Sequence, residues 1–467
     1  MPTIGLEIHA ELKTRTKMFC NCANDPNESR PNVNICPVCT AHPGTLPVIN
    51  KEAVLQVLRV GAAIQGTLAD MSEFDRKSYF YPDIPKGYQI SQYANPLVIG
   101  GTLAGVEITR VHLEEDTARS THSNDRSLVD FNRSGIPLME LVTEPVIHDA
   151  ETAGRFASEL QLLLRTLGAG DANMDKGEMR IEANVSVARS DLATLGTKVE
   201  VKNLNSFRAV EHAIAFEIKR QIALIESGGE VVQETRGWNE GKQETFHQRF
   251  KEGSADYRYF PEPDIPRLFI SEIPEFSTLA IRASLPELPW EKRARWIKEF
   301  GLKEEFAELF LQDIGLGVFF EKVVAGKTPD FITLAINYMT SDLIALIKEK
   351  EEKVFDDVDN FIKLIDMILL HELSSRGAKD VLRFMVLEGG DPEMIARNRS
   401  LIQIHDTEYL KHAVKDVLAE EAKAVGEYQA GKEASLQYLI GKSMKATKGA
   451  GNPSILKELI IEELKNG

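Results

Sequence analysis

Four cysteines lie close together near the start of the chain, with spacings typical of metal ligands. Cys20 and Cys22 form one pair, Cys36 and Cys39 form another, and thirteen residues separate the pairs. Two such pairs can close on one tetrahedral zinc ion. Because four thiolates leave no open position for water, the spacing predicts a structural zinc site in the loop at residues 20–39. The alternative is that the four thiols are simply buried.

A second set of reactive groups follows an alternating pattern. Charged and apolar residues alternate at residues 4–12, 110–114, 180–187 and 198–202, which predicts four strands with one polar face each. These strands and their ends carry the acids, the imidazole and the amide that could bind a cation: Glu7, His9, Glu114, Glu115, Glu182 and Asn184. Clustered carboxylates repel each other unless a cation lies between them, and their oxygens suit Mg²⁺. The pattern therefore indicates either a magnesium site or a solvated sheet surface.

Two further stretches combine lysines with turn residues. Residues 74–89 are rich in aromatic residues and prolines and contain Lys77 and Lys86. Such a loop can be rigid and can present its lysines to an anion, or it can be an ordinary surface turn. Near the C-terminus, three lysines fall within seven residues with no acid between them: Lys442, Lys445 and Lys448. They form either a phosphate-binding patch or a solvated helix end.

The kind of secondary structure that must position these groups changes along the chain. Up to about residue 285 the segments are short and alternating, with two longer helices expected over 149–167 and 207–226. Beyond that point apolar residues recur every three or four positions, which predicts helices almost throughout. We therefore expect an α+β fold. A mixed cradle domain with an antiparallel-rich sheet spans 1–285, and two all-helical domains span 286–395 and 396–467.

Length and composition limit the class of protein. The chain has 467 residues, enough for about three domains, with 43% hydrophobic and 27% charged residues. Its net charge of −16 argues against a protein that coats nucleic acid, so any RNA contact must come from local basic patches. No stretch resembles a membrane helix of ~18 uncharged apolar residues, and the N-terminus lacks the pattern of a signal peptide. We expect a cytoplasmic enzyme, or one chain of a larger enzyme, without a membrane partner.

Several short stretches together resemble the GatB component of the aspartyl/glutamyl-tRNA amidotransferases. They are residues 4–9 (IGLEIH), 74–83 (FDRKSYFYPD), 112–116 (HLEED), 202–207 (KNLNSF) and 256–264 (DYRYFPEPD). Residues 444–449 (MKATKG) are similar to the YqeY-like tail at the C-terminus of that component. Because these stretches run from the first expected strand to the last helices, the resemblance covers nearly the whole chain.

The resemblance implies a function that composition and spacing do not reveal. Members of this family work in a heterotrimer with an amidase subunit and a third, small subunit, on misacylated tRNA. They use ATP and Mg²⁺ to phosphorylate the side-chain carboxylate of Glu-tRNA(Gln) or Asp-tRNA(Asn). Ammonia channelled from the amidase subunit then displaces the phosphate. The resemblance thus implies an ATP-dependent carbon–nitrogen ligase with glutamine as amide donor and a structural Zn²⁺ in part of the family.

The same resemblance assigns roles to individual residues. The implied catalytic residues are Glu7, His9, Lys77, Glu114, Glu115, Glu182 and Asn184. Glu7, His9 and Glu115 are the implied Mg²⁺ ligands, and the family commonly has Asp where this chain has Glu182, which puts a direct metal contact there in doubt. The implied substrate or channel residues are Lys86, Arg180 and Ser206. The implied tRNA contacts are Lys442, Lys445 and Lys448.

Two other functions compete with this one. The first is a non-catalytic, zinc-containing scaffold that binds tRNA, which the clustered acids disfavour. The second is a complete glutamine amidotransferase, which is disfavoured because the cysteines are committed to metal and no serine-lysine amidase signature is apparent. Glu-tRNA and Asp-tRNA both remain candidate substrates, because the choice depends on the synthetases present.

Overall fold

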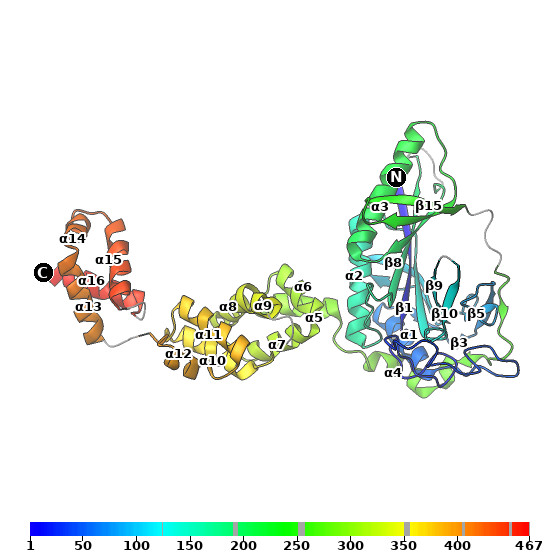
Figure 1. Ribbon diagram of the computed structural model, residues 1–467, viewed down its shortest axis with the longest axis horizontal. Coiled ribbons are helices and arrows are strands. Elements are labelled where there is room, and N and C mark those ends of the chain that lie inside the picture. Colours follow the sequence, from blue (N-terminus) through cyan, green and yellow to red (C-terminus); the bar gives the residue numbers. More distant parts are fainter. Residues whose placement is uncertain are drawn as a thin grey trace. The chain divides into compact units, whose positions relative to one another are not determined.

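The computed structural model describes residues 1–123, 125–189, 195–250, 257–349, 355–403, 407–447 and 451–466. Contacts divide the chain into two compact units, Met1–Pro289 and Trp290–Gly467. The first unit is rich in strands and the second is helical (Figure 1). This confirms the predicted α+β class. The domain boundaries expected at residues 285 and 395 stay predictions.

One large sheet forms the centre of the first unit. Its strand order is β15-β14-β13-β12-β1-β11-β8-β6-β2, with β7 paired to β8. The strands are β1 (Pro2–Glu11), β2 (Thr67–Leu68), β6 (Val98–Ile99), β7 (Thr102–Leu103), β8 (Val106–Glu115), β11 (Pro137–Thr143), β12 (Met179–Val187), β13 (Val199–Leu204), β14 (Glu234–Asn239) and β15 (Glu244–Phe250). The paired strands run antiparallel except β13 and β14, which are parallel. All four strands predicted from the alternating pattern are present.

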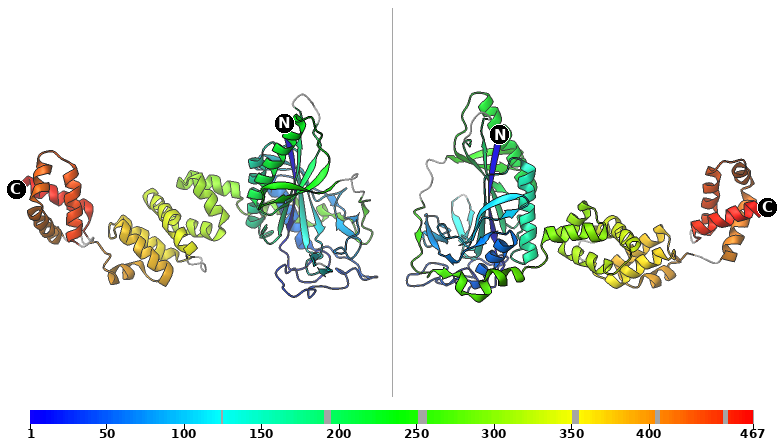
Figure 2. Two further views of the ribbon diagram at one scale, coloured as in Figure 1. Left: turned by 45° about the horizontal axis from the view of Figure 1, so that its top comes forward. Right: turned by 180° about the vertical axis from the view of Figure 1, so that it is seen from behind.

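Three helices cover one face of this sheet (Figures 1 and 2). They are α1 (Lys51–Ala63), α2 (Ala150–Leu167) and α3 (Phe207–Glu226), and α2 packs against both of the others. The Asp149 side chain accepts a hydrogen bond from the Thr152 N–H (2.7 Å) at the start of α2. Gly168, with a φ of 67°, ends that helix in the left-handed conformation. The two helices predicted from periodicity are thereby confirmed.

Smaller sheets face the opposite side of the main sheet. β4 (Asp75–Ser78) lies between β5 (Tyr88–Ser91) and β16 (Phe260–Pro261), so this small sheet joins segments that are far apart in sequence. A second pair consists of β3 (Met71–Ser72) and β17 (Leu268–Phe269), and a hairpin consists of β9 (Arg119–His122) and β10 (Ser127–Asp130). β5 contacts β8, which places the small sheet beside the polar face of the main one.

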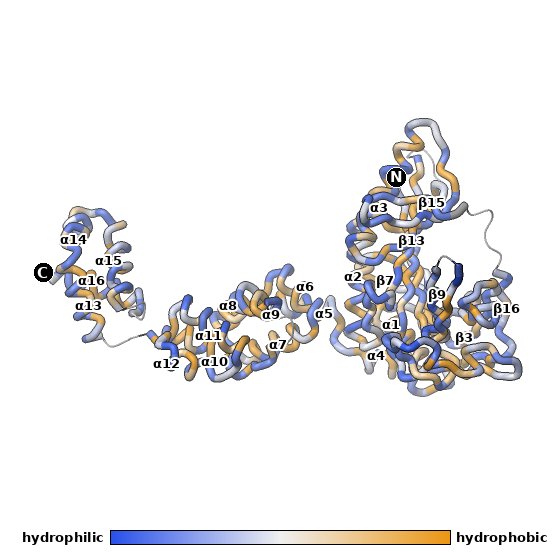
Figure 3. The backbone as a smooth tube through the Cα atoms, viewed as in Figure 1, coloured by the Kyte–Doolittle hydropathy of each residue, from blue (hydrophilic) through white to orange (hydrophobic). Residues whose placement is uncertain are grey.

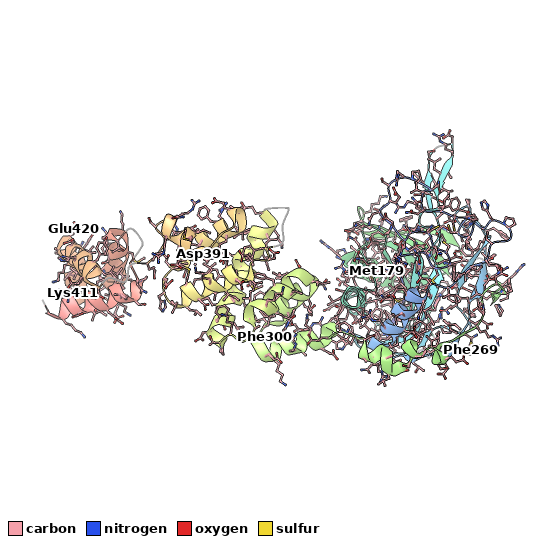
Figure 4. The ribbon with its side chains drawn as sticks, turned by 90° about the horizontal axis from the view of Figure 1, so that it is seen from below. Met179, Phe269, Phe300, Asp391, Lys411 and Glu420 are labelled. Carbon is pink, nitrogen blue, oxygen red and sulfur yellow. The ribbon has the colours of Figure 1, made fainter. Side chains whose placement is uncertain are left out.

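The second unit consists of helices in its described residues. They are α5 (Pro289–Phe300), α6 (Glu304–Gln312), α7 (Ile314–Val324), α8 (Pro329–Tyr338), α9 (Ile344–Glu349), α10 (Val358–Leu369), α11 (Ser375–Glu388), α12 (Pro392–Asn398), α13 (Thr407–Glu420), α14 (Ala422–Gln429), α15 (Ala434–Ala446) and α16 (Pro453–Asn466). Trp296 packs edge-on against Phe310 and Phe320 in one core. Leu410, Leu439 and other apolar residues of α13 to α16 form another. Figure 3 shows hydrophobic and hydrophilic residues interleaved along these helices, as expected when each helix buries one face. Figure 4 marks Lys411 and Glu420, which both belong to α13.

One helical run in this unit has the length and composition of a membrane span. α8 (Pro329–Tyr338), a π-helical turn (Met339–Leu343) and α9 (Ile344–Glu349) form 21 continuous residues with a hydropathy of 1.3 in the most apolar window. About 39% of that window is buried inside the protein. The run contains Asp330, Asp342 and Lys348, so it is not a stretch of ~18 uncharged apolar residues of the kind expected to be absent. A core helix satisfies the same criterion, so the run is weak evidence for a membrane contact.

The burial of α2 leads to a stability prediction. Phe156 on this helix is fully buried, whereas its neighbour Arg155 is exposed. We expect Phe156→Ala to lower the free energy of unfolding of the first unit by about 3–5 kcal/mol, because it leaves a cavity. Arg155→Ala should change it by less than about 0.5 kcal/mol. Hydrogen exchange of the β1 and β12 amides in the full chain measures both effects, and equal protection in the two variants would contradict the packing described.

Candidate functional site

The register of the central strands lines up a row of polar residues on the face opposite the helices. His9 of β1 lies across from Glu140 of β11 on one side and Arg180 of β12 on the other. Glu140 in turn lies across from His112 of β8. Glu7 lies across from Glu182, two residues further along the same face. Strands far apart in sequence therefore contribute adjacent side chains to one surface.

Glu140 is at the centre of this surface. Its carboxylate lies 3.4 Å from His9 Nε2, 3.3 Å from His112 Nε2 and 3.7 Å from a guanidinium nitrogen of Arg110. Glu114 reaches one of the same imidazoles, with its Oε1 3.5 Å from His9 Nε2. Glu140 is 5% exposed, so its charge depends on these partners rather than on water.

Neighbouring charges shift the proton affinities in this cluster. Burial by itself would lower the pKa of His9, but the hydrogen bond and charge of Glu140 raise it to about 9. Burial by itself would raise the pKa of Glu140, but His112 and His9 hold it well below its usual range. Burial and the negative charge of Glu140 raise the pKa of Glu7. The carboxylates of this cluster therefore compete for a limited amount of positive charge.

Two overlapping groups in the cluster have the geometry of a metal site. Glu7, His9 and Glu140 form one, and His112, Glu114 and Glu140 form the other; within each group the ligand atoms lie within 4.8 Å of one another. Carboxylate oxygens are the ligands that Mg²⁺ prefers, and an imidazole can complete such a site. The residues present therefore fit a divalent cation.

Glu115, the third Mg²⁺ ligand implied by the resemblance, lies outside both groups. Successive residues of a strand point to opposite faces, so Glu115 is directed away from its neighbour Glu114. Its Oε1 accepts a hydrogen bond from the Ile90 N–H (3.0 Å) and lies 2.6 Å from Lys86 Nζ. Lys86 and Glu115 thus form a largely buried ion pair beside β5.

This ion pair lines a cavity of about 270 Å³. The opposite wall comes from the cysteine loop and includes Phe19, Cys39 and Pro43. The cavity is therefore part polar and part apolar, with the Lys86–Glu115 pair as its buried charged element. Lys86 lines this cavity, and its implied role at a substrate site or channel stays a prediction.

Lys77 approaches the acidic cluster from β4 of the small sheet. Its Nζ lies 5.2 Å from the centre of the Tyr257 ring. Burial by itself would lower the pKa of Lys77, but the negative charge of Glu114 is chiefly responsible for raising it well above its usual range. The ammonium group therefore stays charged beside the carboxylates, where it can contact a bound anion.

The remaining implied residues of the first unit have surroundings of their own. Arg180 donates to Asp116 at 3.0 Å, and Lys202 donates to both oxygens of Glu182 at 2.7 Å. Asn184 Oδ1 is buried and, among the described residues, accepts no hydrogen bond. Ser206 caps α3, because its Oγ accepts a hydrogen bond from the Ala209 N–H at 3.0 Å. Ser206 therefore has a structural task that is independent of any substrate.

The four cysteines come together as their spacing predicts. Their sulfur atoms all lie within 4.8 Å of one another. Lys17 is fully buried beside them, with its Nζ 3.9 Å from Cys39 Sγ and donating to the Phe131 carbonyl at 3.1 Å. The hydrogen bond from Cys20, helped by the charge of Lys17, lowers the pKa of Cys39 to about 5. Four thiols beside a buried cation fit a thiolate-bound metal such as Zn²⁺.

Two of the lysines expected to contact tRNA, Lys442 and Lys445, lie near the end of α15 (Ala434–Ala446). Lys442 Nζ lies 2.5 Å from a carboxylate oxygen of Glu421, so its charge is partly compensated. Lys445 is exposed, and Lys448 lies outside the described residues. The tRNA contact of these lysines stays a prediction.

Sequence reasoning placed Arg110 and His112 in a strand with a polar face without naming them as site residues, and it did not single out Glu140. Glu140 is the single charged residue in β11, which otherwise reads Pro-Leu-Met, Leu-Val-Thr. A lone acid inside an apolar strand is a usable signal, because an unpaired buried carboxylate is costly. Its partners, however, cannot be deduced without the strand order.

The chain is similar to known proteins along almost its whole length. Residues 2–274 match the family described as the GatB/GatE catalytic domain, and residues 318–464 match the GatB domain. Curated B subunits of aspartyl/glutamyl-tRNA(Asn/Gln) amidotransferases are similar along almost their whole length. The one from Thermomicrobium roseum is 44% identical over 99% of this chain and 98% of its own. Those from Thermoanaerobacter pseudethanolicus (42%, covering 99% and 98%) and Synechocystis sp. (41%, covering 98% and 96%) are comparable.

The metal geometry leads to a binding prediction. We expect Glu140→Gln to weaken the binding of Mn²⁺, used as a paramagnetic substitute for Mg²⁺, by about tenfold to a hundredfold. Glu115→Gln serves as a matched control and should change the affinity by less than about twofold, since Glu115 lies outside both metal groups. Electron paramagnetic resonance of free Mn²⁺ measures the affinity. If Glu115→Gln weakened Mn²⁺ binding more than Glu140→Gln does, the result would instead support Glu115 as a ligand, as the resemblance implies.

The arrangement of the four cysteine sulfur atoms leads to a second metal-binding prediction. We expect one equivalent of Co²⁺ to bind the full chain as a tetrahedral tetrathiolate, with its visible absorption, and Zn²⁺ to displace it. Cys39→Ser should abolish this spectrum, whereas His42→Ala should leave it unchanged, because the neighbouring His42 is outside the sulfur cluster. A spectrum that survives Cys39→Ser would show that the four cysteines do not share one ion.

Proposed function

Given that this chain belongs to the GatB/GatE family of tRNA-dependent amidotransferase components, we propose that it activates the side-chain carboxylate of Glu-tRNA(Gln) or Asp-tRNA(Asn) with ATP. Ammonia then converts the activated carboxylate to an amide. The observation that carries this proposal is the meeting of Glu7, His9, Glu140 and Lys77 on one sheet face, since anionic and cationic groups side by side suit phosphoryl transfer.

The chemistry requires such a surface. A carboxylate is a poor electrophile, because attack on it would expel an oxide. Transfer of the ATP γ-phosphoryl group to one carboxylate oxygen forms an acyl phosphate and releases ADP. Ammonia then attacks the acyl carbon, and the C–O bond breaks to release inorganic phosphate. Such phosphoryl transfer depends chiefly on positioning and on neutralising charge.

The residues of the cluster divide this task. Glu7, His9 and Glu140 would hold Mg²⁺, which when bound neutralises phosphate oxygens. Lys77 keeps its positive charge beside them and would bind the transferred phosphoryl group or the activated carboxyl. Glu114 keeps Lys77 charged, and its Oε1, 3.5 Å from His9 Nε2, would orient the imidazole. Glu182 is held by Lys202 and would act through that pair rather than as a direct ligand.

The partners follow from the same proposal. An amidase partner would supply ammonia, a third and smaller protein would complete the complex, and the assembly would act in the cytoplasm. The cavity beside Lys86 and Glu115 is where we place the entry of ammonia, with Asn184 and Arg180 further along the polar face. The exposed Lys445 and its neighbour Lys442 would contact the tRNA body.

Activity of the assembled complex tests the proposal. We expect His9→Ala and Glu140→Gln to lower amide formation on Glu-tRNA(Gln) by about a hundredfold or more, since each removes a group at the phosphoryl-transfer site. Glutamine hydrolysis by the amidase partner should persist. Glu275→Gln removes an exposed carboxylate of the same unit and should leave both activities unchanged.

Other outcomes would contradict the proposal. If both cluster variants formed the amide at the wild-type rate, the cluster would not be the site of the reaction. A wild-type complex that binds tRNA but shows no ATP consumption dependent on charged tRNA would instead support the non-catalytic scaffold.

A further inference from the structure

Tyrosines are concentrated beside the acidic cluster. Six of the ten tyrosines of the chain lie in or next to the small sheet of β4, β5 and β16: Tyr79, Tyr81, Tyr88, Tyr93, Tyr257 and Tyr259. Tyr257 contacts Tyr79 and Tyr259 edge-on, with ring centres 5.8 and 6.1 Å apart. A core of the same size would use Leu and Phe, so phenolic rings in this number point to a binding surface.

Tyr93 and Tyr81 are the two exposed members of this group, and Tyr93 is the one that stacks face to face on another ring. One face stacks on Tyr259, with ring centres 4.6 Å apart and planes inclined by only 15°. The residue is nevertheless 58% exposed, so its other face meets solvent. A stacked pair whose outer ring is free can accept one more flat ring on top.

The backbone holds this ring in place. The N–H groups of Tyr93 and Ala94 both donate to Oδ2 of Asp75, at 2.8 and 3.1 Å. Asp75 is buried, and the adjacent Gln92 is fixed by hydrogen bonds to Ser72 (2.6 Å) and to the Leu113 N–H (3.0 Å). An exposed aromatic ring on so rigid a support loses little entropy when it binds a ligand.

The stack also lies next to the proposed reaction site. Burial raises the pKa of Tyr259 to about 12, with Lys77 opposing the shift and Glu140 adding to it. Distances agree with this position: the ring centres of Tyr259 and Tyr257 are 6.1 Å apart, and Lys77 Nζ lies 5.2 Å from the centre of the Tyr257 ring. A flat ring placed on Tyr93 would belong to a molecule that enters this site.

We infer that Tyr93, backed by Tyr259, is a stacking platform for an unpaired nucleobase. This inference rests on the proposed function, which brings two such bases to the site: the adenine of ATP and the terminal adenosine at the 3′ end of the tRNA. The two have the same ring chemistry, and stacking does not distinguish between them. The neighbouring lysine and carboxylates would hold the phosphates or the acyl group of the same molecule.

The test uses the complex assembled with its amidase and small partners. Binding is measured for ATP with Mg²⁺, for a tRNA(Gln) transcript, and for the same transcript without its terminal adenosine. Tyr93→Ala should weaken the binding of one adenine-bearing ligand by about tenfold to a hundredfold, whereas Tyr93→Phe, which keeps the ring, should stay within about twofold of wild type. Phe269→Ala serves as the control, because it removes an exposed ring of β17, which pairs with β3 and not with the small sheet (Phe269 is labelled in Figure 4).

The ligand whose binding Tyr93→Ala weakens identifies the base that stacks on Tyr93. If Tyr93→Ala weakens full-length tRNA but not the shortened transcript, the platform holds the terminal adenosine. If it weakens only ATP, the platform holds the adenine of the nucleotide. Unchanged binding of both ligands in a wild-type-active complex overturns the inference while the proposed function stands. Loss of the amidase partner from the Tyr93→Ala complex overturns it as well, because Tyr93 would then belong to a protein–protein interface.

Discussion

The buried carboxylate of Glu140 is the interaction on which the polar face of this protein depends. A charge so far from water is tolerated only with close partners, and here they are two imidazoles and a guanidinium from β1 and β8. This pairing requires β1, β11 and β8 to be neighbours in one register. A slip by one residue would turn His9 or His112 to the opposite face and leave Glu140 unpaired. The strand order and register of the sheet therefore also determine the geometry of the site.

The pleat of β8 separates two acids that are adjacent in sequence. Glu114 joins His9 and Lys77 on the polar face, while Glu115 pairs with Lys86 at the cavity lined by the cysteine loop. Placing both carboxylates on one side would have concentrated negative charge that only another cation could offset. The alternation of the strand instead gives each acid its own lysine. One short sequence, HLEED, thus serves two separate environments.

The small sheet supplies what the large one lacks. The main sheet contributes carboxylates and imidazoles, whereas β4 contributes the ammonium of Lys77 and the tyrosine group contributes flat aromatic surface. This sheet pairs Asp75 and Arg76 with Phe260 and Pro261. The polar face is therefore closed by a segment that comes after both of the long helices in the chain. The cysteine loop has a comparable structural link, because Lys17 joins it to the carbonyl group of Phe131.

Local pattern was enough for the elements and for the groups that are close in sequence. Period-two alternation identified β1, β8, β12 and β13, helical periodicity identified α2 and α3, and cysteine spacing identified the sulfur cluster. The motifs also indicated the family, which the matches along the chain confirm. The sequence did not show which of the acidic side chains lie together in the folded protein. Glu115 was named as a Mg²⁺ ligand because the resemblance implies it, whereas Glu140, the single charged residue of an apolar strand, was not singled out.

Only the tertiary structure decided that question, for a physical reason. The sequence of one strand determines which residues share a face, but not which strand lies beside it. Cross-strand partners are set by long-range packing of the whole sheet against α1, α2 and α3, and that packing placed β11 between β1 and β8. The residue types needed to bind a cation can thus be read from the chain itself. Their meeting around Glu140, and the stacking of Tyr93 on Tyr259, are properties of the folded sheets alone.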